Sequence, residues 1–243
     1  YSSVTGLNNG GFVVTWSDES ASGGDTSSGA ARGQVFQADG TPIGTEFLIN
    51  TTTVGIQQGP TVTSLTNGGF VVAWQDFSRT GGDTSGAAVR GQVFQADGTA
   101  TGSEFLVNTA TTNAQYQSSV TGLNNGGFVV TWADQSSTGG DTSSIAVRGQ
   151  LFKADGTATG SEFLINTTTT NQQLTPSVAS LTNGGFVVAW KDESQTGGDT
   201  SSSAVRAQVF SINNDPIYTS ATATNAAENQ TAAIDIQAND SDG

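Results

Sequence analysis

The acidic residues that could do chemistry recur at a fixed spacing of 58 residues along this chain of 243. One set lies in the loop motif GGDT and comprises Asp25, Asp83, Asp141 and Asp199. An Asp in a Gly-rich loop either bonds to its own backbone in a turn or binds a hard cation through its carboxylate. One or two carboxylates per loop suit the weak, extracellular class of calcium site. The residues leave both alternatives open, and these four aspartates are the candidate calcium ligands of the loops.

A second set of charges is an Asp–Arg pair that repeats in all four units. Asp18 lies two residues after a tryptophan and Arg32 follows it in the next apolar run, and both positions return every 58 residues. If the two runs form a hairpin with Asp18 opposite Arg32, the side chains can form a bidentate ion pair. Charge pairs repeated through an array are usually architectural. We therefore predict a structural salt bridge at the start of each long loop.

Catalysis finds little support in the residue types. The chain has no histidine and no cysteine, which removes nucleophile–histidine arrangements and thiol chemistry. A glycosidase needs two carboxyl groups in different environments, whereas these acids repeat identically in every unit. We therefore predict that the protein is not an enzyme. A formal net charge of −14 argues against nucleic acid as a partner, and no apolar run is long enough for membrane insertion.

These charged residues are positioned by a repeating unit built around the stretch GGFVVTW, residues 10–16. In a strand, Phe12, Val14 and Trp16 point to one side, while Val13 and Thr15 point to the other. Neither side carries charge, which indicates a strand buried between two layers. An Asn-Gly pair precedes the stretch in every unit, and Asn-Gly beside such a run is a strong hairpin signal.

Four strands are predicted in each unit, over residues 3–7, 11–18, 31–37 and 46–50 of the first. Tight turns follow the first and third strands, at Asn-Gly and Asp-Gly, and long polar loops follow the second and fourth. An antiparallel meander with this alternation places both tight turns on one rim and both long loops on the other. Such sheets must stack on their neighbours to bury their faces, and a radial stack is a β-propeller. The alternative, a tandem immunoglobulin-like array, needs about 100 residues per sandwich.

The predicted fold is therefore all-β: four 58-residue, four-stranded antiparallel units stacked as a β-propeller, or as part of one, over residues 1–220. The repeat dissolves near the end of the fourth unit, and we place a domain boundary near Ser220. An unpaired sheet edge invites another chain, so residues 216–223 are expected to pair with the third strand of unit four, or the fragment is expected to pack edge-on against a neighbouring copy. Tyr1 aligns with Gln117 inside a unit, so the chain is expected to begin partway through a longer gene product.

The string GGFVVTW, followed by a loop, RGQVFQADGT and GxEFLVNT, resembles repeats of very large secreted bacterial surface proteins. These are the repeats-in-toxin adhesins and their cadherin-containing relatives, and the resemblance spans residues 1–213. Residues 227–229 (AEN) and 239–243 (NDSDG) resemble the opening of a bacterial cadherin-like domain, a β-sandwich that would begin within residues 221–243. Acids of that opening bind calcium between domains, which implies Glu228, Asp240 and Asp242 as calcium ligands.

The resemblance implies an exported, calcium-loaded and adhesive protein. The expected function is a non-enzymatic, calcium-associated repeat module of a bacterial surface adhesin, or of a matrix- or filament-forming protein, in the extracellular space or at the cell surface. Expected partners are other copies or neighbouring domains of the same protein and surface polysaccharide. The alternative is a carbohydrate-binding, lectin-type propeller, which needs exposed aromatic side chains on the long-loop rim, where Phe77 is the loop aromatic.

Overall fold

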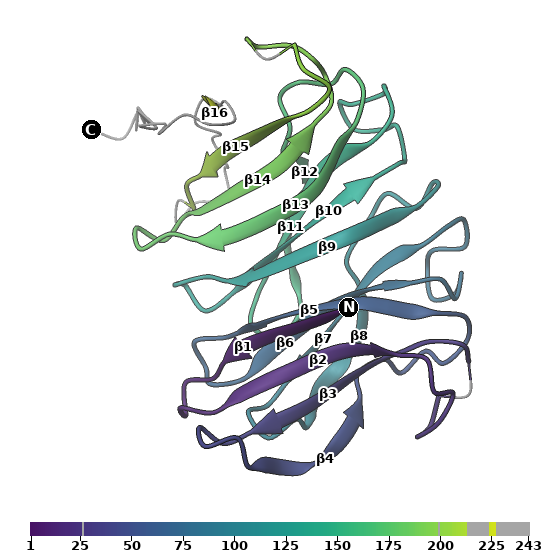
Figure 1. The fold of residues 1–243 in the computed structure, drawn as a ribbon, viewed down its shortest axis with the longest axis vertical. Helices are drawn as coiled ribbons and strands as arrows, with labels where there is room; N and C mark the ends of the chain where they lie inside the picture. Colours follow the sequence, from purple (N-terminus) through teal and green to yellow (C-terminus); the bar gives the residue numbers. More distant parts are fainter. Residues whose placement is uncertain (26, 199, 213–223, 227–243) are drawn as a thin grey trace.

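A computed structural model describes residues 1–25, 27–198, 200–212 and 224–226. These residues form four antiparallel four-stranded sheets, here called blades, and contain no helix. Each blade is a meander whose strands pair in the order of the chain. Figure 1 shows the blades following one another through the molecule, from β1–β4 to β13–β16. The prediction of an all-β protein built from four four-stranded antiparallel units is confirmed.

The strands repeat at nearly the same positions in every unit. The first blade contains β1 (Ser2–Gly6), β2 (Phe12–Asp18), β3 (Ala30–Phe36) and β4 (Pro42–Leu48). The second contains β5 (Gln57–Ser64), β6 (Phe70–Asp76), β7 (Ala88–Phe94) and β8 (Ala100–Leu106). The third contains β9 (Gln115–Gly122), β10 (Phe128–Asp134), β11 (Ala146–Phe152) and β12 (Ala158–Leu164). The fourth contains β13 (Gln173–Ser180), β14 (Phe186–Asp192), β15 (Ala204–Phe210) and β16 (Thr224–Ala226).

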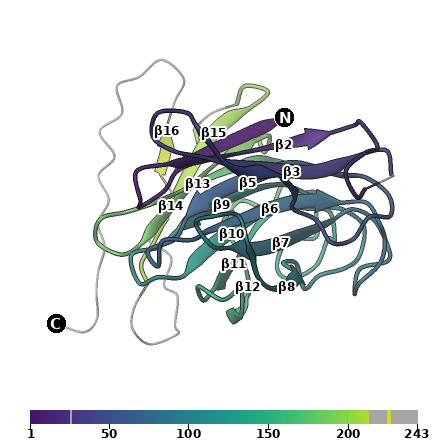
Figure 2. The same ribbon diagram turned by 90° about the horizontal axis from the view of Figure 1, so that it is seen from below.

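The first strand of each blade lies innermost. β1 contacts β5, β5 contacts β9, and β9 contacts β13, so these four strands form a central layer. Figure 2 shows the same stack from below, with the remaining strands extending away from that layer. This radial order is the arrangement of blades in a β-propeller. The meander places the tight turns on one rim of the stack and the long loops on the other, as the loop lengths predict.

Hydrophobic cores form between blades. Each core joins two unlike faces: a Trp face, which carries Phe128, Val130 and Trp132 in the third blade, and a Val face, which carries Val71 and Val89 in the second. Trp74 and Trp132 are 0% exposed and Trp190 is 2% exposed, so the predicted burial of these side chains between adjacent sheets is confirmed. Trp16 is the exception because it is only partly buried.

The hairpin between the second and third strands has a register two residues away from the predicted one. Phe12 pairs with Phe36 and Trp16 pairs with Arg32, whereas the prediction placed Asp18 opposite Arg32. The two phenylalanine rings stack with centroids 5.0 Å apart, and this aromatic cross-strand pair favours the observed register. Asp18 still reaches Arg32, because diagonal neighbours on one face of a sheet lie within reach of long side chains.

The fourth strand begins earlier than predicted. It covers Pro42–Leu48, not residues 46–50, and its pairing with the third strand shifts register at a bulge. The amide of Gln34 donates to the Ile43 carbonyl at 3.0 Å across this irregularity. Gly44 has a φ of +68°, a conformation that glycine adopts without steric cost. The irregular backbone explains why alternation of side chains failed to locate the start of this strand.

Several predictions fall outside the described residues. They are the boundary near Ser220, the pairing of residues 216–223 and the cadherin-like opening with Glu228, Asp240 and Asp242. Within this region only Thr224–Ala226 is described, and it pairs with β15. In the described part of the chain, no helix has the length and apolarity to cross a bilayer.

Candidate functional site

The predicted Asp–Arg pairs form in all four blades. Arg90 Nε lies 2.6 Å from Asp76 Oδ2, and Arg90 Nη1 lies 3.1 Å from the carboxylate of Glu104. All three side chains are almost fully buried. A buried guanidinium is stable only when its charge is paired and its N–H groups are satisfied, and the carboxylates on both sides of Arg90 meet that need. The equivalent Asp–Arg pairs are Asp18–Arg32, Asp134–Arg148 and Asp192–Arg206.

Three GGDT aspartates, Asp25, Asp83 and Asp141, each belong to a buried polar chain that runs from one blade to the next. The Asn108 amide donates to Asp83 Oδ2 at 3.0 Å and to Gln115 Oε1 at 3.2 Å. Gln115 in turn donates to Asp134 Oδ1 at 2.9 Å, and Asp134 holds Arg148. The chain therefore links a long loop of the second blade to the ion pair of the third. It repeats as Asp25–Asn50–Gln57–Asp76 and as Asp141–Asn166–Gln173–Asp192.

This arrangement shows what the loop aspartates do in the described blades. The second oxygen of Asp83 accepts the backbone N–H of Ser85 at 3.1 Å, the self-bonded turn that the sequence offers as one alternative. Asp25 and Asp141 have the same partners and are 1% and 2% exposed, and Asp199 lies outside the described residues. No group of three or more carboxylates gathers within the described residues in a way that could hold a metal. Calcium binding by these loops stays a prediction.

Hydrogen bonds keep Asp192, the last residue of the third polar chain, ionised. Burial alone would raise the pKa of Asp192, but hydrogen bonds from Ser194, Gln173 and Arg206, together with the Arg206 charge, outweigh it and hold that pKa below its ordinary value of 3.8. Hydrogen bonds to the charged form of a carboxyl group favour that form. Asp192 is therefore a structural anion in its blade.

A different group of residues lines a central pocket of about 480 Å³ between the inner strands, at their ends nearest the long loops. All four blades contribute to its wall, which includes Tyr1, Ser2, Gly59, Tyr116, Gln117 and Thr175. Hydroxyl and amide groups and two phenol rings dominate the lining, and none of the lining side chains is charged. We call this hollow the central pocket.

The backbone at the central pocket is unusual at one repeat position. Gly59, Gln117 and Thr175 have φ values of +62°, +55° and +50°, and each lies in a bulge of an inner strand. Positive φ is rare for residues with a side chain and is an outlier for a β-branched threonine. Bulges re-aim side chains near functional sites, and strained backbone concentrates at such sites. Here the two strained residues, Gln117 and Thr175, and the glycine at the same repeat position converge on one hollow.

Tyr116 is the more enclosed of the two phenols. Its hydroxyl accepts a hydrogen bond from Gln135 Nε2 at 3.2 Å. Burial raises the pKa of Tyr116, and the nearby Asp134 charge adds to the effect, although the Gln135 hydrogen bond opposes it. The phenol is therefore neutral at physiological pH and can donate its proton to a hydrogen-bond acceptor. Tyr1, by contrast, is 92% exposed at the same pocket.

Sequence reasoning missed this pocket because it searched for residues that repeat. Position 59 and its equivalents are Gly59, Gln117, Thr175 and Tyr1, which all differ, whereas the second and third strands are nearly identical between units. A unique site in a symmetrical array requires differences of this kind. Variation among the units of this one chain was therefore the signal that could have located it.

Similarity to known proteins is found by comparing structures and not by comparing sequences. No family model matches the chain, and no curated protein does. Among solved structures, an alpha-L-arabinanase of Penicillium chrysogenum complexed with arabinobiose aligns with a TM-score of 0.59 at 17% identity, over 91% of this chain and 66% of that one. The alpha-L-arabinofuranosidase arb93a of Fusarium graminearum gives 0.57 at 11%, over 91% and 66%. A Dyadobacter fermentans protein of unknown function gives 0.57 at 15%, over 90% and 67%.

These alignments show a shared fold, and the chain spans about two thirds of the length of the proteins that it matches. They overturn two predictions made from sequence: that the chain is a non-enzymatic, calcium-associated adhesin module, and that it is not an enzyme. Glycoside hydrolases, among them an arabinanase and arabinofuranosidases, are prominent among its structural neighbours. The adhesin prediction rested on the resemblance of the repeats, and the non-enzyme prediction rested on the absence of histidine and cysteine and on acids that repeat identically in every unit.

Proposed function

We propose that the protein is carbohydrate-active, of the kind represented by the glycoside hydrolase propellers, and that it takes a neutral saccharide in the central pocket. The observation that carries the proposal is the convergence of three left-handed, bulged residues, Gly59, Gln117 and Thr175, on one hollow of about 480 Å³. The strain at Gln117 and Thr175 persists only where the surrounding structure holds it. A preformed concave site with a few convergent polar groups is the expected form of a small-ligand site.

The chemistry of the lining favours a neutral sugar. Amide groups of Gln75 and Gln117 and hydroxyls of Ser118 and Thr175 lie around the pocket. Amides and hydroxyls both donate and accept hydrogen bonds, as sugar hydroxyls do. The ring of Tyr116 adds an apolar surface with a polar end, which suits the C–H face of a sugar. With no charged side chain in the lining, a uronic acid would find no counter-ion. An arabinose oligomer, as in the Penicillium complex, is the natural probe.

The described acids are suited to structure more than to acid–base catalysis. A glycosidase needs a general acid with a raised pKa and a second, ionised carboxylate beside the scissile bond. Asp192 has a lowered pKa, and Asp76 and Asp134 are 1% exposed beneath their arginines. Binding of the saccharide is therefore the part of a carbohydrate-active function that the described residues support directly.

Calorimetric titration with arabinobiose and with linear arabinan tests the proposal, combined with an assay for released reducing ends. Tyr116→Ala is expected to weaken binding about tenfold or more, since buried tyrosines are frequent binding hot spots. Tyr116→Phe separates the hydroxyl from the ring. Phe77→Ala is the matched control, because Phe77 is an exposed aromatic on a long loop and does not line the pocket.

The outcomes are distinct. Binding that Tyr116→Ala weakens and Phe77→Ala preserves supports the proposal, and sugar release lost in the same variant extends it to hydrolysis. Absence of binding to every neutral saccharide tested would overturn it. Binding that the two variants weaken equally would also overturn it, because the site would then lie elsewhere.

A further inference from the structure

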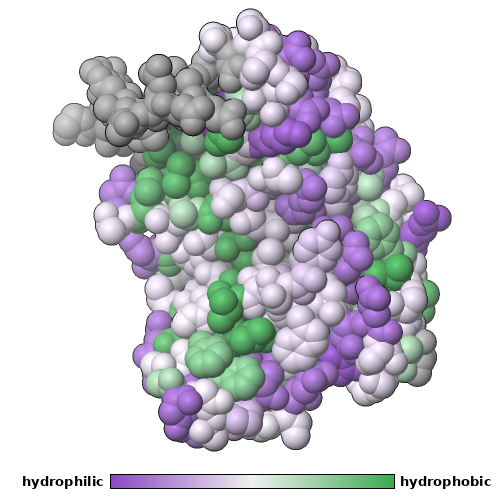
Figure 3. Space-filling view, in the orientation of Figure 1, coloured by the Kyte–Doolittle hydropathy of each residue, from purple (hydrophilic) through white to green (hydrophobic). Residues whose placement is uncertain are grey.

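The first blade presents an uncovered Trp face. Phe12, Val14 and Trp16 are only partly buried, and Val4 beside them is 63% exposed. The equivalents of Phe12 and Trp16 in the second and third blades are 0% exposed, because the Val face of the preceding blade covers them. Figure 3 shows hydrophobic side chains gathered over β1 and the start of β2. Contiguous apolar surface of this kind marks an interaction site.

Within the described residues, the opposite end of the stack presents a Val face on which no further blade packs. Val205 is 59% exposed and Val187 is partly buried. The equivalents of Val205 in the second and third blades, Val89 and Val147, are both 0% exposed. The two open ends of the described blades are therefore the two unlike halves of the interface that repeats three times inside the molecule.

A polar latch accompanies two of the three interior interfaces, those between the first and second blades and between the second and third. Glu104 Oε2 accepts the backbone N–H groups of Thr51 and Thr52 in the preceding blade, at 2.7 and 3.1 Å. Its other oxygen meets Arg90 Nη1 at 3.1 Å. Glu162 binds the equivalent loop of the second blade in the same way. The carboxylate therefore joins the ion pair of one blade to the loop of the one before it.

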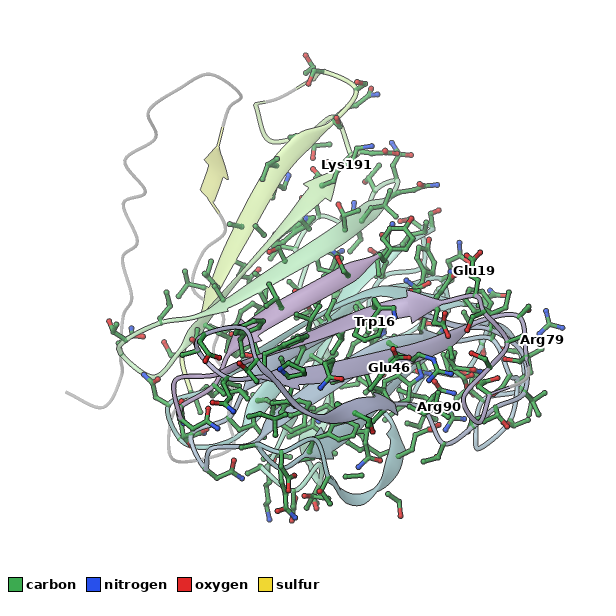
Figure 4. The ribbon with its side chains drawn as sticks, turned by 60° about the horizontal axis from the view of Figure 1, so that its bottom comes forward. Trp16, Glu19, Glu46, Arg79, Arg90 and Lys191 are labelled. Atoms are coloured by element: carbon green, nitrogen blue, oxygen red, sulfur yellow. The ribbon has the colours of Figure 1, made fainter. Side chains whose placement is uncertain are left out.

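In the first blade, Glu46 occupies the latch position, but no loop of a preceding blade lies against it within the described residues. Glu46 lies 3.2 Å from Arg32 and its side chain is 48% exposed, whereas the side chains of Glu104 and Glu162 are 4% and 5% exposed. Figure 4 shows Glu46 and Trp16 together on the first blade. The first blade therefore presents both the apolar face and the carboxylate of such an interface.

We propose that the Trp face of the first blade is a docking surface for one further four-stranded blade of this same repeat. Its Val face would cover Trp16, and its loop N–H groups would bind Glu46. Three interior interfaces that pack a Trp face on a Val face, two of them with the latch, specify this partner. About nine tenths of this chain aligns with about two thirds of each structural neighbour, so each neighbour has further residues outside the aligned part. The inference does not depend on the saccharide site.

The test adds the proposed partner to the chain of 243 residues. A copy of residues 57–116 is joined directly before Tyr1, because Tyr1 and Gln117 occupy the same repeat position. The copy carries Trp74→Phe, so that the new terminal blade adds no tryptophan. Acrylamide quenching then reports on Trp16, since Trp74, Trp132 and Trp190 of the original chain are already buried. We expect the quenchable emission of the unextended chain to be lost in the extended one.

A second measurement isolates the latch. Glu46→Gln is expected to lower the melting temperature of the extended chain and to leave that of the unextended chain nearly unchanged. Equal effects in both chains would contradict the proposal. So would an added blade that folds by circular dichroism while Trp16 stays quenchable, or one that stays unfolded, because a matching face should template it. An unextended chain that sediments as a dimer with Trp16 protected would identify a second copy as the partner and overturn the proposal.

Discussion

At the scale of single residues, the main feature is a polar chain that is buried and yet fully satisfied. Asn108 and Gln115 are 1% and 0% exposed and connect Asp83 to Asp134. Burial of amides and carboxylates is costly unless each finds a partner, and an incomplete network is worse than an apolar core. Each member therefore depends on all the others, which ties the position of one blade to the next.

Removing the side-chain amide of Asn108 from this hydrogen-bond network should destabilise the protein. Asn108 also accepts the backbone N–H of Val89 at 2.8 Å, so Asn108→Ala leaves a carboxylate and a buried N–H without this partner. We expect a loss of about 2–3 kcal/mol in the free energy of unfolding. Asn124→Ala, which removes an exposed amide bound to the Leu181 carbonyl, should cost less than about 1 kcal/mol. Urea unfolding of both variants measures the difference, and equal costs would contradict this account.

The lowered pKa of Asp192 predicts how stability depends on pH. A carboxyl group whose pKa is lower in the folded state stabilises the fold above its unfolded pKa of about 3.8. That contribution is lost as the pH falls through the folded pKa. We expect melting temperatures to be steady between about pH 7 and pH 5 and to fall below about pH 4. Asp192→Asn should lower stability at neutral pH and flatten the acid slope, and an unchanged slope would contradict the assignment.

At the scale of the strand, bulges produce local backbone geometry that a regularly alternating strand does not have. β5, β9 and β13 each contain a register shift, and β4 contains the glycine Gly44 with positive φ. The bulges of the inner strands lie at the central pocket, whereas the straight strands β6 and β10 lie in the cores. Regular strands thus build the blades, and irregular ones shape the hollow between them.

Relief of the strain at Thr175 should separate stability from binding. Thr175 has a φ of +50°, which glycine adopts freely. Thr175→Gly is therefore expected to leave the free energy of unfolding unchanged or to raise it by about 0.5–1 kcal/mol, while weakening saccharide binding. Thr170 lacks positive φ, so the control Thr170→Gly should lower stability by about 1 kcal/mol. Thermal melts and calorimetry report both quantities, and a clear loss of stability in Thr175→Gly would refute the strain argument.

At the scale of the whole molecule, stability is a sum over neighbouring blades. The three hydrophobic cores each join two consecutive blades, as expected for a repeat protein in which each unit contacts its neighbours. Figure 4 shows Glu19 and Arg79 on the long loops, away from these cores. The effect of a substitution on the free energy of unfolding should therefore depend more on the blade interface in which the residue lies than on the residue type.

The two tryptophan environments test that expectation. Trp132 is 0% exposed between the second and third blades, whereas Trp16 is partly exposed at the end of the stack. Trp132→Ala is expected to cost about 3–5 kcal/mol, and Trp16→Ala roughly half as much, because less apolar area returns to water. Denaturant unfolding of the two variants provides the comparison. Equal losses would mean that the end blade is as well covered as the interior ones.

The amino-acid sequence by itself determined the architecture of the repeat. A spacing of 58 residues, Asn-Gly and Asp-Gly turns and strands with two apolar faces are local or periodic signals, and they predicted the four-stranded units, the two rims, the buried tryptophans and the Asp–Arg pairs. Each of these depends on neighbours along the chain or on the same position in the next unit. Strict repetition made them visible in a single sequence.

Only the tertiary structure decided the hairpin register, the polar chain between blades and the central pocket. Asn108 and Gln115 look like loop and strand polar residues until the next blade brings Asp134 to them. The pocket joins residues from different units, and at one repeat position, that of Gly59, Gln117 and Thr175, the residue types all differ. Such contacts arise from packing between sheets, which no local pattern encodes, and the bulges that create them break the alternation by which strands are recognised.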